Sequence, residues 1–211
     1  MKKILYSVAL AVCCMGTMTS CSDFLDASNK SNVTAKQSFA TKEGLNNLVN
    51  NAYQHLQNVY AAPLFTSCFS AGTDMYADAR NKMNEALNTY ETLTPENTDI
   101  KNLYTYLYAG IRAANSVSYY AQTAQVDDKT KGQLVGEARV LAAYEYYLLV
   151  NNFGGVPIMK DFLTTADTGY PKSSAADVYA YIISELEEVI SKNVLQASTA
   201  TKGGGRISQE T

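Results

Sequence analysis

Residues 131–157 read KGQLVGEARVLAAYEYYLLVNNFGGVP, and their spacing predicts a helix over residues 131–152. One apolar stripe recurs at steps of three and four and consists of Leu134, Ala138, Leu141, Ala142, Leu148 and Leu149. Further apolar residues lie off this stripe, so the predicted helix packs on more than one face. Gly154-Gly155, with Pro157 beyond, is a typical signal for a helix C-terminus.

Three further segments show the same apolar period, over residues 45–60, 100–121 and 178–192. N-cap residues stand before the second segment at Asn97–Asp99, and Ser174–Asp177 forms a capping box before the third. All four prolines fall between these segments, and no convincing alternating strand pattern is present. The sequence therefore predicts an all-α fold built from stacked helical hairpins.

Composition excludes several classes of protein. The chain has 211 residues, with 17 Lys and Arg against 20 Asp and Glu, and this net charge of −3 argues against a nucleic-acid binder. A hydrophobic content of 46% excludes a disordered chain. With one histidine, His55, and no zinc-protease, P-loop or nucleophile-elbow motif, we expect no catalytic residue, no metal site and no cofactor.

The first twenty residues have the pattern of a secretory signal. Lys2 and Lys3 precede an apolar stretch, residues 4–15, that is shorter than the ~20 residues of a membrane span. Small residues before Cys21 are similar to a bacterial lipobox, whose cysteine becomes the first mature residue and carries lipid; ordinary cleavage near Ser20 is the alternative. We expect a lipoprotein signal peptide at 1–20, a lipidated N-terminus and tether at 21–43, and a helical domain at 44–211.

The four cysteines have separate predicted roles. Cys13 and Cys14 would leave with the signal peptide, and Cys21 would be the lipid anchor. Cys68 is then a lone thiol, which we expect to be a small buried residue. No disulfide is predicted within the mature chain.

The polar connection over residues 65–93 is the candidate ligand-binding segment. A connection of this length is unusual unless it forms binding surface or short helices. The candidate contacts are Asp74, Tyr76, Asp78, Arg80 and Asn81. The chain also contains 16 tyrosines, but most of those in predicted helices fall on apolar stripes and are expected in the core. His55 is expected to be a half-exposed flank residue.

Several motifs resemble one family. Cys21–Asp26 is similar to the mature N-terminus of SusD-like (RagB/SusD) nutrient-binding lipoproteins, and Ile111–Asn115 to one of their helices. The most specific similarity is Gly136–Tyr144, GEARVLAAY, running on to FGGVPI at 153–158. Asn51–Tyr53, Asp177–Tyr179 and Gly205-Arg206 also fit. The family often has arginine where Ala142 stands, so an ion pair of the family is expected to be missing.

The resemblance implies an all-α fold with tetratricopeptide-like hairpins and attachment to the outer membrane, facing the cell exterior. It also implies partnership with a SusC-like TonB-dependent transporter and capture of oligosaccharides for import. Members are usually much longer, so the chain is expected to be an N-terminal portion. Two alternatives remain open: a helical module that docks a transporter or other partner without binding nutrient, and a binder of peptides rather than glycans.

Overall fold

The computed structural model describes residues 34–61, 63–76, 85–165, 169–197 and 205–209. Its helices are α3 (Ala35–Ser38), α4 (Lys42–Tyr60), α5 (Leu64–Phe69), α6 (Glu85–Thr89), α7 (Thr98–Ala121), α8 (Asp128–Phe153) and α9 (Ala175–Lys192). The described ranges contain no strand. The predicted all-α class is therefore confirmed.

Side-chain caps begin the long helices at the predicted places. Asn97 Oδ1 accepts hydrogen bonds from the backbone N–H groups of Asp99 and Ile100, at 3.0 and 3.2 Å. Ser174 and Asp177 form the predicted capping box, in which each side chain accepts from the other residue's backbone N–H. Gly154 ends α8 with φ of 68°, a conformation that glycine adopts without strain.

Helix α4 begins earlier than the predicted domain start at residue 44. Thr41 caps it by accepting a 3.0 Å hydrogen bond from the Gly44 N–H. The preceding residues form α3, and Phe39 packs against the first core cluster. The predicted tether over residues 21–43 therefore includes helical residues at 35–38 and 42–43, and the partly buried Phe39 gives it a contact with the core that its polar composition conceals.

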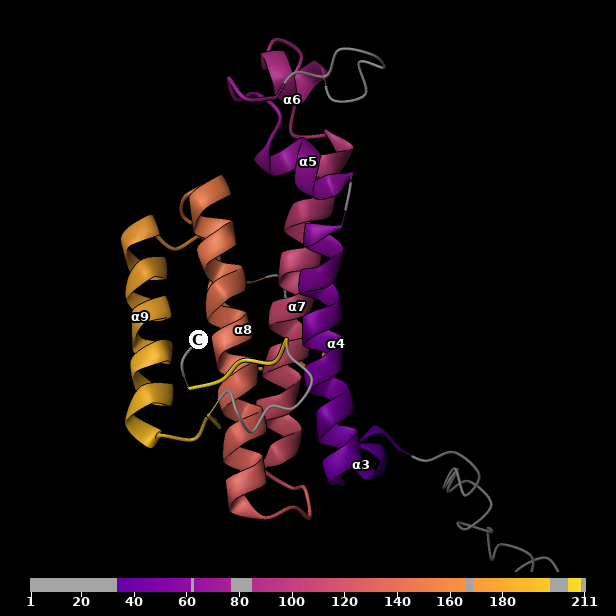
Figure 1. Cartoon of the computed structure of the whole chain (residues 1–211), viewed down its shortest axis with the longest axis vertical. Coiled ribbons are helices and arrows are strands. Elements are labelled where there is room, and N and C mark those ends of the chain that lie inside the picture. The colour runs from indigo at the N-terminus through magenta and orange to yellow at the C-terminus, as the bar shows by residue number, and fades with distance from the viewer. Residues whose placement is uncertain (1–33, 62, 77–84, 166–168, 198–204, 210–211) are drawn as a thin grey trace, which may run out of the picture. The chain divides into compact units, whose positions relative to one another are not determined.

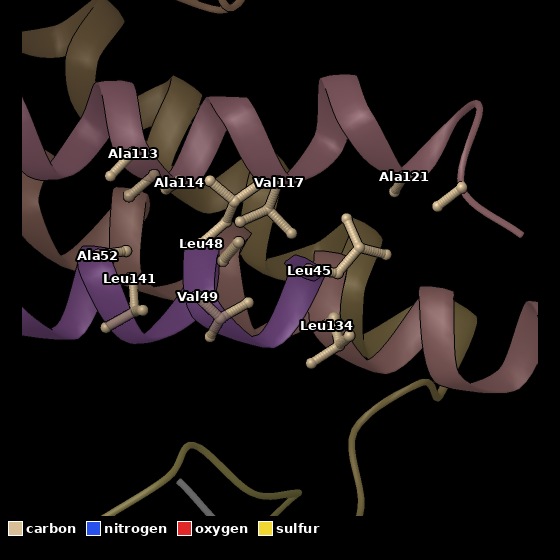
Figure 2. Packing of buried hydrophobic residues seen from close by; sticks show 13 residues of the cluster. Leu45, Leu48, Val49, Ala52, Ala113, Ala114, Val117, Ala121, Leu134 and Leu141 are labelled. Atoms are coloured by element: carbon tan, nitrogen blue, oxygen red, sulfur yellow. The ribbon is translucent and has the colours of Figure 1, made fainter. Parts of the chain in front are cut away.

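Successive long helices run antiparallel, in the order α4, α7, α8 and α9 (Figure 1). Each of these helices packs on the next, and α4 also contacts α8. The first core cluster joins α4, α7 and the N-terminal half of α8, with small residues such as Ala113, Ala114 and Ala121 on α7 (Figure 2). The second cluster joins α7, the C-terminal half of α8 and α9 around Tyr146, which is fully buried. Helix α8 contributes to both clusters, as its apolar residues on several faces predicted.

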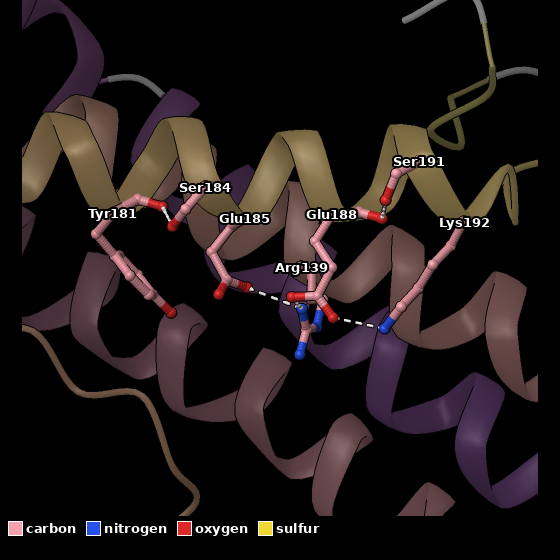
Figure 3. A network of polar contacts seen from close by, with 7 residues as sticks. All are labelled: Arg139, Tyr181, Ser184, Glu185, Glu188, Ser191 and Lys192. Atoms are coloured by element: carbon pink, nitrogen blue, oxygen red, sulfur yellow. Dashed lines mark hydrogen bonds and ion pairs between the residues drawn. The ribbon is translucent and has the colours of Figure 1, made fainter.

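A polar network links α8 to α9 at the surface (Figure 3). Arg139 pairs with Glu188 and lies 3.6 Å from Glu185 Oε2, and Lys192 pairs with the other oxygen of Glu188. Lys192 and Arg139 together lower the pKa of Glu188. Glu188 is half-buried because Arg139 reaches across from α8 and pairs with it.

Candidate functional site

The structure describes two of the five predicted ligand contacts. Asp74 is exposed in a turn after α5, and Tyr76 is half-buried, with its backbone N–H donating a 3.4 Å hydrogen bond to the Thr73 carbonyl. Asp78, Arg80 and Asn81 lie outside the described residues, as does the predicted lipidation site Cys21. The predicted binding role of these residues stays a prediction.

The start of this connection is folded back against α6. Gly72 has φ of 75°, and a Cβ at this position would lie 2.1 Å from the hydroxyl oxygen of Tyr90. Its N–H donates a weak 3.5 Å hydrogen bond to Asn88 Oδ1. Glycine is required here because any side chain would collide with Tyr90 and because φ is positive. The connection contains the short helices α5 and α6, one of the two possibilities expected for a segment of this length.

Five aromatic side chains form a cluster beside α5, which we name the aromatic surface. It consists of Tyr60 on α4, Phe65 and Phe69 on α5, and Tyr144 and Tyr147 on α8. The Tyr60 and Tyr144 hydroxyls are hydrogen-bonded to each other. The Tyr144 and Tyr147 rings stack with centroids 6.2 Å apart, and the Phe65 ring lies 5.3 Å from those of Tyr60 and Phe69.

The aromatic surface departs from the expectation that helical tyrosines are mainly core residues. Tyr146 is fully buried, but Tyr60, Tyr144 and Tyr147 are 42%, 39% and 47% exposed. The apolar stripe of α8 does not separate these residues, because Tyr146 also lies off it and yet is fully buried. Burial and the hydrogen bond to Tyr144 raise the pKa of Tyr60 to about 12, so its hydroxyl stays protonated and neutral at physiological pH.

An apolar groove of about 610 Å³ begins at the aromatic surface. Tyr144 and Tyr147 line it together with Ile182 and Ile190 of α9 and Ile207 near the C-terminal end of the described residues. Ile190 is 75% exposed, so one wall of the groove faces solvent. The groove has the size of a small-ligand pocket but offers few polar groups to orient a ligand.

A buried carboxyl group holds the segment 205–209 against the helices. Glu137 on α8 is fully buried, and its Oε2 accepts hydrogen bonds from Arg206 Nε at 2.8 Å and from the Tyr53 hydroxyl at 3.3 Å. Gln133 donates to Oε1 at 3.1 Å. The Tyr53 hydroxyl also accepts a 2.8 Å bond from the Ile207 N–H. The Glu of the GEAR motif therefore joins α4, α8 and the Gly205-Arg206 segment.

Cys68 and His55 lie apart from this network. Burial, with a smaller effect of Asp99, raises the pKa of the half-buried Cys68 thiol to about 12, so it is not a ready nucleophile. His55 is half-buried on the flank of α4, as expected, and burial lowers its pKa. Within the described residues no group of three or more potential metal ligands is present.

Comparison with known proteins gives a family match and a relative that bears the same family name. Residues 23–201 match the SusD-like family described as "Starch-binding associating with outer membrane". SusD-like protein P38 of Formosa agariphila is 28% identical over 190 residues, which are 88% of this chain and 36% of that protein.

Two solved structures are also similar. Surface glycan-binding protein A from Bacteroides uniformis has a TM-score of 0.67 and 26% identity, over 80% of this chain and 39% of that one. A SusD homolog from Bacteroides thetaiotaomicron has a TM-score of 0.65 and 21% identity, over 86% of this chain and 36% of that one. The chain thus spans between a third and two fifths of the length of each of these relatives. Because the family match covers most of the sequence, the chain belongs to the SusD-like family.

Proposed function

We propose that this protein is a cell-surface glycan-binding lipoprotein that captures oligosaccharides and passes them to a SusC-like TonB-dependent transporter. The observation that carries the proposal is the family match over residues 23–201. The 26% identity to a surface glycan-binding protein supports the same ligand class. The protein acts by binding alone and does not hydrolyse its ligand.

The aromatic surface supplies the chemistry for binding a neutral sugar. The C–H faces of a pyranose ring pack well on an aromatic face, and a tyrosine adds a hydroxyl that both donates and accepts hydrogen bonds. Tyr60, Tyr144 and Tyr147 present such rings to solvent. Asp74 and Tyr76, in the connection that follows α5, would add polar contacts to the ligand.

Attachment to the outer membrane is proposed to use lipid on Cys21, with residues 1–20 removed as a signal. No helix in the described part of the chain is long and apolar enough to cross a membrane. Acyl chains stabilise membrane attachment by ~0.8 kcal/mol for each buried methylene group, so several chains on one cysteine anchor a protein stably. Growth with labelled palmitate should label the wild type, and Cys21→Ala should abolish the label.

Glycan arrays followed by titration calorimetry test the sugar assignment. We expect Tyr144→Ala and Tyr147→Ala each to weaken binding of the recognised oligosaccharide by about fivefold or more, the effect of losing an aromatic contact of about 1 kcal/mol. Tyr179→Ala is the matched control, because Tyr179 is 39% exposed on α9 and outside the aromatic surface. Tight peptide binding with no glycan ligand would refute the sugar assignment.

One observation favours a second function, that of a helical interaction module. The apolar groove and the exposed side chains of Ile183 and Ile190 offer a hydrophobic surface that suits a protein partner better than a sugar. Co-purification with the transporter, without a calorimetric response to any glycan, would select this function. Loss of co-purification in Ile190→Asp would place the contact on α9.

A further inference from the structure

Arg112 lies near the middle of α7 and lines a hollow. This hollow shares no residue with the aromatic surface. The hollow has a volume of about 330 Å³ and is lined by Phe39, Asn51, His55, Tyr120 and Phe162 among others. A second hollow of about 370 Å³ shares Arg112 and is lined by Asn115, Asp161, Thr164 and Thr165. Both hollows fall at the lower end of the size range of small-ligand sites.

The chain after α8 is fixed beside Arg112 by hydrogen bonds to its backbone. Asn115 Nδ2 donates to the Met159 carbonyl at 2.8 Å, and the Met159 N–H donates to the Tyr146 hydroxyl at 2.7 Å. Phe162 follows three residues later and lies within a group of rings, 5.3 Å from Tyr119 and 5.8 Å from Tyr120 between centroids. This wall of the hollow is therefore preorganised.

Arg112 has no anionic partner among the described residues. Of the three arginines described, Arg139 and Arg206 form ion pairs, whereas Arg112 is exposed and has no carboxylate within ion-pair distance. Its guanidinium carbon lies 5.6 Å from the centroid of the Phe162 ring. Contact with this ring limits the positions of the guanidinium and leaves its hydrogen-bond donors available.

The two hollows differ in charge. Asp161 lines the 370 Å³ hollow, where its carboxylate would repel an anion. Among the described residues, no aspartate or glutamate lines the 330 Å³ hollow, whose remaining polar groups, on Asn51, His55, Ser116 and Tyr120, are amide, imidazole and hydroxyl groups. His55 Nδ1 is buried without a hydrogen-bond partner in the described chain. One cation, an aromatic wall and several neutral hydrogen-bonding groups suit a ring molecule that is mostly polar and carries one oxyanion.

We propose that the 330 Å³ hollow binds the oxyanion of an acidic saccharide, with Arg112 pairing with a carboxylate or sulfate and Phe162 packing against the sugar ring. Arg112 fits either group because its planar guanidinium can donate two parallel hydrogen bonds. The inference rests on the proposed function in taking the ligand to be a saccharide, but it concerns a separate set of residues.

Calorimetry with three tetrasaccharides tests this proposal: a galacturonate oligomer, a sulfated galactan oligomer and an uncharged glucan oligomer. We expect the protein to bind at least one acidic oligomer and Arg112→Gln to weaken that binding about tenfold or more, the usual effect of losing a charge-assisted hydrogen bond. Arg112→Lys should recover part of the loss, because it keeps the charge but not the planar fork. The preferred oligomer identifies the oxyanion as carboxylate or sulfate.

Two further variants separate this site from other effects. Lys101→Gln removes an exposed positive charge from the same helix and should change acidic binding less than twofold. Phe162→Leu should weaken acidic binding and leave uncharged-glucan binding intact. If Arg112→Gln binds the acidic oligomer as the wild type does, or if no acidic oligomer binds, the proposal is wrong. If no uncharged glycan binds at the aromatic surface, that result would instead count against the proposed function.

Discussion

Glu137 and Glu145 lie two turns apart on α8 and are both fully buried, yet their surroundings are opposite. Glu137 receives hydrogen bonds from Tyr53, Gln133 and Arg206. Both carboxyl oxygens of Glu145 are buried with no hydrogen-bond partner in the described chain. Within one helix, Glu137 is thus fully hydrogen-bonded, whereas the carboxyl group of Glu145 is buried without a hydrogen-bond partner among the described residues.

The difference comes from what faces each carboxyl group. Arg206 reaches Glu137 from a segment far along the chain, whereas α7 presents Gly110 to Glu145. A Cβ on Gly110 would lie 1.7 Å from Glu145 Oε1, so the glycine provides the space that the carboxyl group occupies. Burial raises the pKa of Glu145 well above its usual value and so favours its protonated form, whereas Glu137 is ion-paired.

Removing the partner of Glu137 should have the largest effect. Arg206→Met leaves Glu137 buried without its cation, and we expect the free energy of unfolding to fall by ~3 kcal/mol, the lower end of the range because Arg206 is partly exposed. Urea unfolding measures this change in the free energy of unfolding. The double variant Arg206→Met with Glu137→Met should recover most of the loss, and an additive double variant would show that the two residues do not act together.

Replacing Glu145, in contrast, should stabilise the protein. Glu145→Leu removes an unpartnered buried carboxyl group, and we expect the free energy of unfolding to rise by ~2 kcal/mol at pH 8. Because the folded-state pKa of Glu145 is raised, its contribution to stability is greatest below its unfolded pKa of about 4.3 and is lost as the pH rises toward the folded pKa.

The same site predicts a change in pH dependence. Glu145→Gln keeps the side-chain size but does not titrate, so its free energy of unfolding relative to that of the wild type should increase between pH 5 and pH 8. Urea unfolding at several pH values measures this difference. A constant difference across the range would show that Glu145 titrates as an exposed glutamate does.

Gly110→Ala tests the fit between α7 and α8. In the wild type the added methyl group meets the Glu145 carboxyl group, and we expect a loss of ~1–2 kcal/mol from overpacking. In a Glu145→Ala background the same change should be neutral or slightly stabilising, because alanine favours a helix over glycine by up to ~1 kcal/mol. Equal effects in both backgrounds would contradict the contact.

Breaking the surface network of Figure 3 should have the smallest effect. Arg139→Gln removes its pairs with Glu185 and Glu188, which are partly exposed. We expect less than ~1 kcal/mol of destabilisation, decreasing with added salt. A loss comparable to that in Arg206→Met would mean that exposure does not distinguish the two arginines.

Local patterns were sufficient for the helices but not for contacts distant in sequence. The capping box at Ser174, the N-cap at Asn97 and the glycine after α8 were visible because each acts within a few residues. The contact of Arg206 with Glu137 spans 69 residues, and whether Tyr144 is exposed depends on where α9 packs, so no local period encodes either. Gly110 could not be interpreted before Glu145 was known to face it.

The Glu137 network also predicts an order of events during synthesis. The ribosome releases Tyr53 and Glu137 well before Arg206, so the nascent α4, α7 and α8 can pack while the Glu137 carboxylate still lacks its cation. Burying that charge early is unfavourable, which disfavours final closure of this part of the core until residues 205–209 emerge. For the export proposed above, such a delay would keep the chain loosely folded while it is still being made.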